Sequence, residues 1–578
     1  MSSLSSWAGT RGIRATSGPT LRPTTPWRDG PTSRLASLTQ TARLPTLVLV
    51  SHGAWRSAWP RVLMVGLVLT GCSTAAHQPS RRPQPVAQPL TQSDLRWLNR
   101  VTFGLDSATV ARYRALGRAG FLDEQFQAPP PDPPDLATAI GTLTITQQSA
   151  ERLLREVRAE QQRINTLTGE DDKQRARTVL NQSGNQLAYE TAKRHLMRAL
   201  YSPGQLREQM TWFWMNHFSV HAAKASVRWT LGEYEERAVR AHALGKFRAL
   251  VLATVRSPAM LDYLDNAQSA AGRLNENYAR ELMELHTLGV SGGASGSRYS
   301  QQDVQELARV LTGVGINATD SVPRLPPPRQ ALYVRDGLFE FNPARHDFGA
   351  KTLLGRHISG AGFPEVEEAV TLLSRDPATA RFISRKLATY FVADDPPPRL
   401  VETMAETFRR SDGDIAAVLR VLFLSPELAT LLAQAPAGTG KFKDPLQFVV
   451  SSLRLAYDGK VISNYRPVVG WLNQLGEPLY GRVTPDGYAL VEPAWTSSGQ
   501  LVKRFEIARA IGAGSAGLFN TEDDQSGPRV AFPMLNNRLF YEAIEPTLSA
   551  RTREALGRTA SQQEWNTVLL AAPDWMQR

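Results

Sequence analysis

The stretch Leu274-Asn-Glu-Asn-Tyr-Ala-Arg-Glu-Leu-Met-Glu-Leu-His-Thr-Leu-Gly289 has the residue pattern of an amphipathic helix. Apolar side chains recur every three or four residues and line one face of that helix. Asn277, Glu281 and Glu284 stand at positions i, i+4 and i+7, so they share a polar stripe about 100° away from the apolar face. The stretch therefore predicts one helix, over residues 275–288, that carries two neighbouring carboxylates.

Helical periodicity of this kind extends over most of the chain beyond residue 90. We therefore expect an all-α fold, a large multi-helix globular domain. The best strand signals, at 338–341 and 351–354, flank a turn at Asn342-Pro343 and predict one small β-hairpin. The expected helices cover residues 91–100, 107–127, 146–164, 173–200, 204–220, 227–256, 364–432, 445–457, 498–512, 535–556 and 561–571.

Segments rich in proline mark where the helical part begins and where it divides. Residues 72–90 are polar and Pro-rich, which is typical of an extended tether. Thr91 and Asp94 then form a capping-box pattern that starts the first helix. A Pro/Gly-rich break at 435–445 divides the rest into a main helical lobe, 91–434, and a C-terminal helical lobe, 435–578, of the same domain.

Residues 1–71 have the features of a leader that ends at the only cysteine of the chain, Cys72. A basic segment precedes a short apolar run, 62–70, which cannot span a bilayer but is typical of a signal peptide. The junction Leu69-Thr-Gly-Cys72 resembles a bacterial lipobox, so we expect cleavage before Cys72 and attachment of a lipid to its sulfur. The leader is longer than a signal peptide needs, and we expect the true translation start to lie downstream of residue 1.

Lipid attachment at Cys72 predicts that the membrane is a partner of the protein. Ser73 follows the cysteine instead of an aspartate, which resembles sorting to the outer membrane. No run of 18 apolar residues follows the leader, so we expect a soluble domain on this anchor. The sequence therefore predicts an outer-membrane lipoprotein at the periplasmic face of the cell envelope.

The formal net charge of +12 is concentrated in the leader. Residues 1–71 hold eight arginines and one aspartate, a net charge of +7, which leaves +5 for the remaining chain. Without a basic cluster there is little to bind phosphates, so we expect no nucleic-acid partner.

Six segments together resemble the large bacterial family of exported proteins named domain of unknown function 1800. The resemblance implies an exported, largely helical protein, often encoded beside another exported protein, with no established activity. This sequence has Val314 where the family pattern leads us to expect tryptophan. We therefore do not expect an aromatic side chain at that position to be indispensable. The segments are Leu98-Asn-Arg-Val-Thr-Phe-Gly104, Phe213-Trp-Met-Asn-His-Phe218, Ser257-Pro-Ala-Met260, 274–289, 303–313 and His346-Asp347.

Four residues are candidates for catalysis: Glu281, Glu284, His346 and Asp347. Two carboxylates on one helix stripe can act as an acid/base pair or bind a divalent metal, and Glu281, Glu284, His217 and His346 are the candidate metal ligands. The alternative is a structural network in which arginines and backbone donors satisfy the carboxylates.

Three further residues favour structural roles. His286 points to another side of its helix than Glu281 and Glu284, so we expect a packed histidine. Asp303 follows Ser300 in a second capping-box pattern. Trp495 can stack on a sugar or a partner from its loop, or fill the core, and its context favours the core.

Two functions are open at this point. The first is an accessory lipoprotein of the cell envelope that works with an exported protein partner. The second is an envelope hydrolase, metal-assisted or carboxylate-based, that uses Glu281, Glu284, His346 and Asp347. If the four groups gather in one concave site the hydrolase is favoured, and if they pair with arginines in a dry interior the accessory role is favoured.

Overall fold

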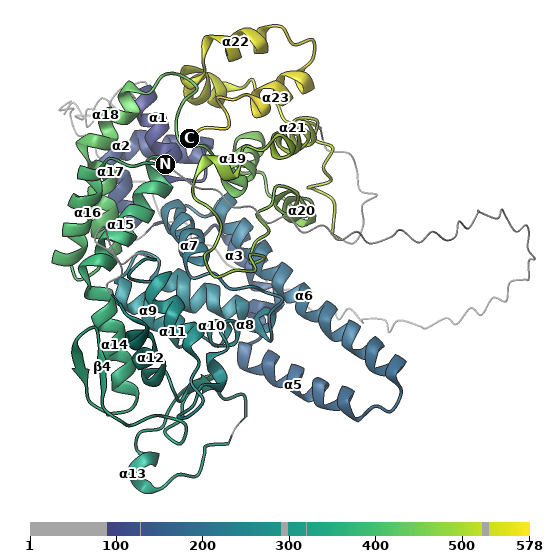
Figure 1. Ribbon diagram of the computed structural model, residues 1–578. Coiled ribbons are helices and arrows are strands. Elements are labelled where there is room, and N and C mark those ends of the chain that lie inside the picture. The colour runs from purple at the N-terminus through teal and green to yellow at the C-terminus, as the bar shows by residue number, and fades with distance from the viewer. Residues whose placement is uncertain (1–89, 128, 291–298, 320, 523–530) are drawn as a thin grey trace, which may run out of the picture. The chain divides into compact units, whose positions relative to one another are not determined.

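Helices dominate the computed structural model, which describes residues 90–127, 129–290, 299–319, 321–522 and 531–578 (Figure 1). The predicted mostly helical fold with a small β element is confirmed. The leader, Cys72 and nearly all of the predicted tether lie outside the described residues. The described residues belong to one compact unit of the chain.

The first part of this unit is a series of helices that start with the predicted capping box. The Thr91 side chain accepts from the backbone of Asp94, whose carboxylate accepts from the Thr91 backbone. The elements are α1 (Gln92–Val101), α2 (Ser107–Gln127), α3 (Pro134–Gly141), α4 (Thr144–Gln147), α5 (Ala150–Thr166), α6 (Glu170–Tyr201), α7 (Gln205–His217), α8 (Val227–Glu233), the π-helix η1 (Tyr234–Val239), the 3₁₀ turn η2 (Arg240–His242), α9 (Phe247–Val255), α10 (Pro258–Tyr263) and α11 (Glu276–Glu284).

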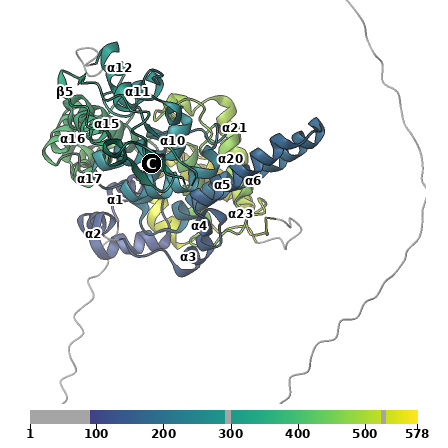
Figure 2. The same ribbon diagram turned by 90° about the horizontal axis from the view of Figure 1, so that it is seen from below.

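Helices α5 and α6 form a hairpin whose tip projects away from the other helices (Figures 1 and 2). The exposed half of α6 is strongly polar, whereas its last two turns are buried. Those buried turns pack beside α7 and α8, which contribute much of the hydrophobic core.

The two predicted strands are present as β3 (Phe339–Phe341) and β4 (Lys351–Leu353), but they do not pair with each other, and each pairs instead with strands that were not predicted. β3 pairs antiparallel with β1 (Val314–Ile316) and β2 (Val334–Asp336). β4 pairs with β5 (Arg356–Ile358) across a tight turn. The shorter β4–β5 connection needs less loop closure than a hairpin across the Asn342-Pro343 turn.

The second part of the unit returns to helices and shares its core with the first. Trp97 of α1 donates through its ring nitrogen to the Phe423 carbonyl (2.8 Å), and one cluster of buried apolar side chains runs from Leu95 to Met576. The predicted Ser300–Asp303 capping box is confirmed, and Trp495 is buried at 5% exposure. The elements are α12 (Gln301–Val310), α13 (Pro327–Gln330), α14 (Phe363–Arg375), α15 (Pro377–Phe391), α16 (Pro398–Arg410), α17 (Ile415–Leu424), α18 (Pro426–Gln434), α19 (Pro445–Tyr457), α20 (Arg466–Gln474), η4 (Glu492–Ala494), α21 (Ser498–Gly512), η5 (Phe540–Ile544), η6 (Glu545–Thr547), α22 (Ala550–Gly557) and α23 (Gln562–Ala571).

Within the described ranges, no single helix has both the length and the apolar composition of a bilayer span. The pair α17 and α18, bent by 44° at its junction, meets those two criteria only when taken together.

Candidate functional site

Helix α11 carries the predicted carboxylates, and it ends earlier than the sequence suggests. After Glu284 the chain leaves the helix in a wide turn, in which the backbone N–H of His286 donates to the Glu281 carbonyl (3.0 Å). That turn directs His286 into the interior, where its side chain is fully buried.

Glu281 and Glu284 lie side by side on α11, and both are partly buried. Burial, the neighbouring Glu284 and Asp486 together raise the pKa of Glu281. Arg280, the arginine of the same helix, donates to Gln301 and lies 3.8 Å from Glu276. Glu281 is therefore a carboxyl group that keeps its proton to a higher pH than an ordinary glutamate does.

His217, the last residue of α7, is held in one tautomer. Its Nε2 lies 3.0 Å from the His286 carbonyl, which only accepts, so Nε2 carries the proton. Its Nδ1 then accepts from the ammonium of Lys386 on α15 (2.9 Å). Burial and the Lys386 charge keep the pKa of His217 well below its usual range, so the ring is neutral.

Lys386 is the cation of what we call the histidine–lysine cluster, His217, His286 and Lys386. Burial lowers the pKa of Lys386 to about 8, against the opposing effect of Asp486. Burial, with a smaller effect of Lys386, lowers the pKa of His286 to about 3. Within the described residues neither ring nitrogen of His286 has a hydrogen-bond partner. Buried polar atoms without partners are uncommon and often mark functional positions.

The loop that carries Asp486 is fastened to α7 beside His217. Asn216 donates to the Tyr488 carbonyl (3.0 Å) and accepts from the Tyr488 backbone (2.6 Å). Between these bonds the backbone of Gly487 has φ +75°, and a Cβ added there would stand 2.1 Å from the Asn216 carbonyl oxygen. The position therefore requires glycine, and it fixes Asp486 next to the cluster.

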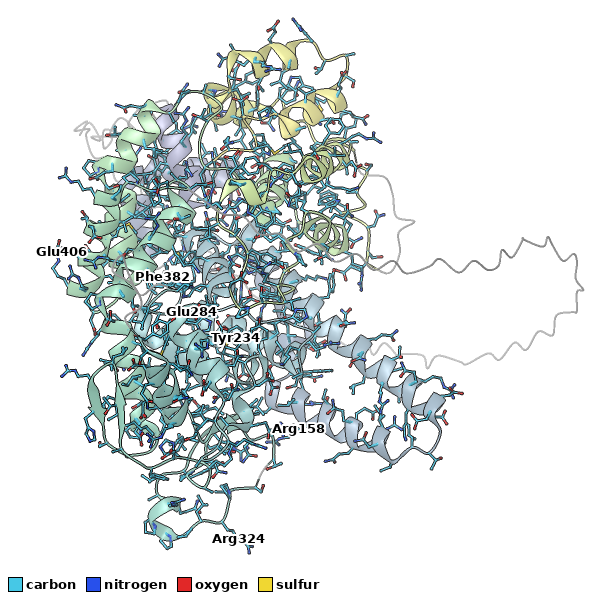
Figure 3. All side chains as sticks on the ribbon, in the orientation of Figure 1. Arg158, Tyr234, Glu284, Arg324, Phe382 and Glu406 are labelled. Carbon is cyan, nitrogen blue, oxygen red and sulfur yellow. The ribbon has the colours of Figure 1, made fainter. Side chains whose placement is uncertain are left out.

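Asp486 links the histidine–lysine cluster to the carboxylates of α11 electrostatically, since it affects the pKa of both Lys386 and Glu281. Although burial acts against it, hydrogen bonds from Arg482 (2.8 Å) and Thr484 (2.5 Å) lower the pKa of Asp486. The site thus combines a carboxyl group with a raised pKa, Glu281, a carboxylate with a lowered pKa, Asp486, and an amine with a lowered pKa, Lys386. Figure 3 labels Glu284 of α11 and Phe382 of α15, which mark two of the four segments that form the site.

His346 and Asp347, the other predicted catalytic residues, belong to a separate network. His346 is 3% exposed and bonds through Nε2 to Glu365 (2.9 Å), whose other oxygen accepts from the buried Lys351 (2.7 Å). Asp347 pairs with Arg309 (2.8 Å), which lowers its pKa to about 2. His346 and Asp347 therefore lie in a network of paired side chains, as the structural alternative to a catalytic site predicts for Asp347 and an arginine.

The predicted metal ligands do not share partners, because His346 is bonded to Glu365 and His217 to Lys386. In the described part of the chain, no three His, Cys, Asp or Glu side chains are grouped as ligands of one ion. The structure adds two residues that the sequence does not single out, Lys386 and Asp486. A lysine on an amphipathic helix has the pattern of a surface residue, and the Pro485-Asp-Gly-Tyr488 turn is the one signal that points to Asp486.

The fold and the site define a mostly helical protein in which two segments of the family resemblance, 213–218 and 274–289, meet at a buried histidine–lysine cluster. The sequence model of the family described as protein of unknown function (DUF1800) matches residues 96–577, so the chain belongs to that family. No curated protein and no solved structure gives a significant match.

Proposed function

We propose that this protein is an outer-membrane lipoprotein, anchored through Cys72, whose helical unit is a carboxylate-based hydrolase acting in the cell envelope. The observation that carries the hydrolase is the opposite shift of two neighbouring carboxyl groups, Glu281 upward and Asp486 downward in pKa. Such a pair supplies an acid and a base at the same pH. The lipobox at Cys72 supports the location.

In this reaction water is added across a polar bond of the substrate. Asp486 accepts a proton from the attacking water, and protonated Glu281 donates a proton to the leaving group. The Lys386 ammonium, held by Nδ1 of His217, stabilises the negative charge that develops on the substrate. Activity is expected to fall as the pH rises, because Glu281 loses its proton first and Lys386 loses its charge near pH 8.

A second function, an accessory lipoprotein that binds an exported partner, is favoured by the network around His346 and Asp347. Those side chains are fully engaged by Glu365, Thr312 and Arg309, so they take no part in hydrolysis. In that case the histidine–lysine cluster recognises a group of the partner.

The test is the release of soluble fragments from isolated bacterial cell envelopes, measured by mass spectrometry. Glu281→Gln removes the proton donor but keeps the side-chain shape, so release should fall by about a hundredfold or more. Glu276→Gln makes the same charge change on the same helix, away from Asp486, and should leave release unchanged. Wild-type protein that releases nothing, yet retains an exported protein from the envelope fraction, would establish the accessory role instead.

A further inference from the structure

A hollow of about 360 Å³ lies between α4, the start of α5, α6 and the junction of α8 with η1. The apolar part of its lining is formed by Ile140, Ile145, Leu153 and Trp229. The charged part is formed by side chains of α6, α8 and η1. Hollows of this volume and mixed lining are typical of sites for small molecules.

Two arginines of the charged part are held rigidly from behind. Nη2 of Arg194 donates to the Gly232 carbonyl (2.5 Å) and lies 3.5 Å from Glu235. Arg198, one turn further along α6, pairs with Glu236. Since these partners are fixed on α8 and η1, the guanidinium groups are oriented before any ligand arrives.

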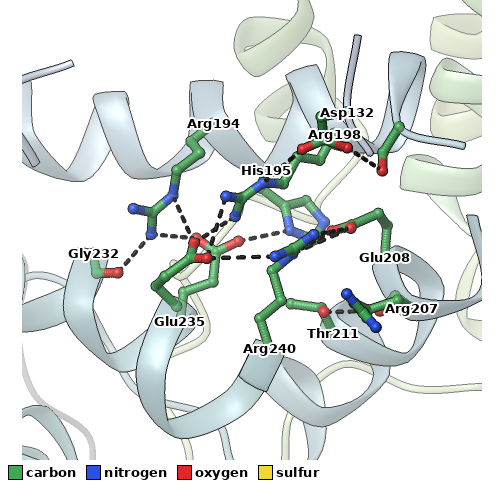
Figure 4. A network of polar contacts seen from close by, with 12 residues as sticks. Asp132, Arg194, His195, Arg198, Arg207, Glu208, Thr211, Gly232, Glu235 and Arg240 are labelled. Carbon is green, nitrogen blue, oxygen red and sulfur yellow. Dashed lines mark hydrogen bonds and ion pairs between the residues drawn. The ribbon is translucent and has the colours of Figure 1, made fainter. Parts of the chain in front are cut away.

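Glu235 is the centre of the network in Figure 4, and it is fully satisfied within the protein. Its oxygens lie 3.0 Å from Nδ1 of His195 and accept from the Tyr480 hydroxyl (3.0 Å). Burial acts to raise its pKa, but the hydrogen bond with His195 and the charge of Arg194 prevail and hold the pKa at about 2. The negative charge of Glu235 is therefore balanced by its partners in the network, and Glu235 itself does not line the hollow.

Arg237 differs from the other arginines of the hollow, because it is exposed and has no hydrogen bond or ion pair with the described part of the chain. It lies on the π-helix η1, an element that often marks functional sites. The same side chain also borders a second hollow of about 260 Å³, which shares Ala150 and Glu233 with the first. Its guanidinium is thus available to a ligand.

The charged side chains that line the hollow are three arginines, Arg194, Arg198 and Arg237, and two glutamates, Glu233 and Glu236. Arg194 and Arg198 pair with Glu235 and Glu236, whereas Arg237 acts only through its charge, on the pKa of Glu233. A guanidinium group binds a carboxylate through two parallel hydrogen bonds, and the single guanidinium without an ion pair matches a monoanion better than a dianion. The apolar part of the lining accommodates the body of such a molecule.

We propose that this hollow binds a small monoanionic carboxylate with an apolar or aromatic body, whose carboxylate pairs with Arg237 and whose body lies against Trp229 and Ile145. This site is separate from the histidine–lysine cluster. It therefore does not depend on the proposed hydrolase.

The test is calorimetric titration of the full chain with naphthoate, alongside the uncharged analogue naphthalenemethanol. Arg237→Gln should weaken naphthoate binding by about tenfold, since one charge-assisted pair is lost. Arg158→Gln is the matched control, because Arg158 is an exposed arginine of α5 outside the lining. Thr146→Trp, at an exposed residue of the rim, should fill the hollow and abolish binding.

Both substituted side chains are exposed, and unchanged circular-dichroism melts would confirm that the variants fold. The proposal is overturned if wild-type protein does not bind naphthoate or binds naphthalenemethanol equally well. It is also overturned if Arg237→Gln and Thr146→Trp bind like wild type, or if Arg158→Gln loses as much affinity as Arg237→Gln.

Discussion

At the scale of single residues, Lys386 is a buried cation that lowers the stability of the folded protein. Burial lowers its pKa to about 8, whereas an unfolded lysine titrates near ~10.4. Below pH 8 the folded protein carries a charge that water would solvate better. Residues placed in this way often serve function at the expense of stability.

Lys386→Met is therefore expected to stabilise the protein, by about 1–3 kcal/mol at pH 7. The unfolded wild type binds more protons than the folded one between pH 8 and ~10.4, so wild-type stability rises over this range and the advantage of the variant shrinks. Guanidinium unfolding at pH 7 and pH 10 measures both effects. Lys503→Met, at a lysine paired with Glu506 on the surface, is the control and should change little. A variant less stable than wild type at pH 7 would contradict this view of Lys386.

Glu365 differs from Lys386, because its negative charge stabilises the folded protein by balancing a buried ammonium group. It accepts from Lys351 (2.7 Å), and Lys351 is 1% exposed. Glu365→Gln leaves that ammonium without its counter-charge and should lower the free energy of unfolding by about 3–5 kcal/mol. Urea denaturation measures the loss, and Glu368→Gln, exposed on the same helix, should lose less than about 0.5 kcal/mol. Equal stability of the two variants would show that Lys351 does not depend on Glu365.

At the scale of elements, local sequence patterns predict where helices and strands begin, whereas contacts with other elements decide where a helix is interrupted and which strands pair. The capping boxes at Thr91 and Ser300 depend on four consecutive residues, and both are present as predicted. The single helix predicted over 227–256 is instead divided by η1 and η2, because Glu235 and Arg240 must reach partners on α6 and α7. The strand pairing has both origins, since β1 comes to β3 from a distant segment, whereas β2–β3 and β4–β5 are local hairpins that the predicted pairing did not include.

The junction between α7 and the Asp486 loop offers a test at this scale. Gly487→Ala places a Cβ where the Asn216 carbonyl stands, and it adds strain at φ +75°. Gly459 has a similar φ of +85°, but a Cβ there meets nothing within 4 Å. We expect Gly459→Ala to cost about 1 kcal/mol and Gly487→Ala at least about 2 kcal/mol more, measured by chemical denaturation. Similar costs for both would mean that the loop moves freely away from α7.

At the scale of the whole molecule, the candidate site is assembled from four distant segments. Glu281, Glu284 and His217 could be selected from the sequence because they stand within its most informative stretches, whereas His286 was predicted to be a packed histidine outside the site. Lys386 could not, since only the packing of α15 against the end of α7 brings its ammonium to His217. The sequence also could not predict that His346 lies apart from the site, because its partner Glu365 stands on another element, α14.

The proposed anchor is also a property of the whole molecule, since it fixes where the helical unit works. Cys72→Ser removes the sulfur that would carry the lipid, so palmitate labelling should disappear and the protein should leave the membrane fraction. Ser73→Asp is the matched control: labelling should persist, while the protein shifts to the inner membrane. Labelling and membrane retention that survive Cys72→Ser would exclude the lipoprotein proposal.

The π-helix η1 has a consequence for insertions and deletions. Its wider turn holds one residue more than an α-helical turn, and Arg240, directly after it, pairs with Glu208. Deleting one residue from 234–239 would let this turn tighten to α-helical geometry while Arg240 keeps its direction toward Glu208, whereas deleting one residue from the regular helix α8 would rotate everything after it by about 100°. We therefore expect related chains with the same network to differ in length by one residue at this segment more readily than within α8.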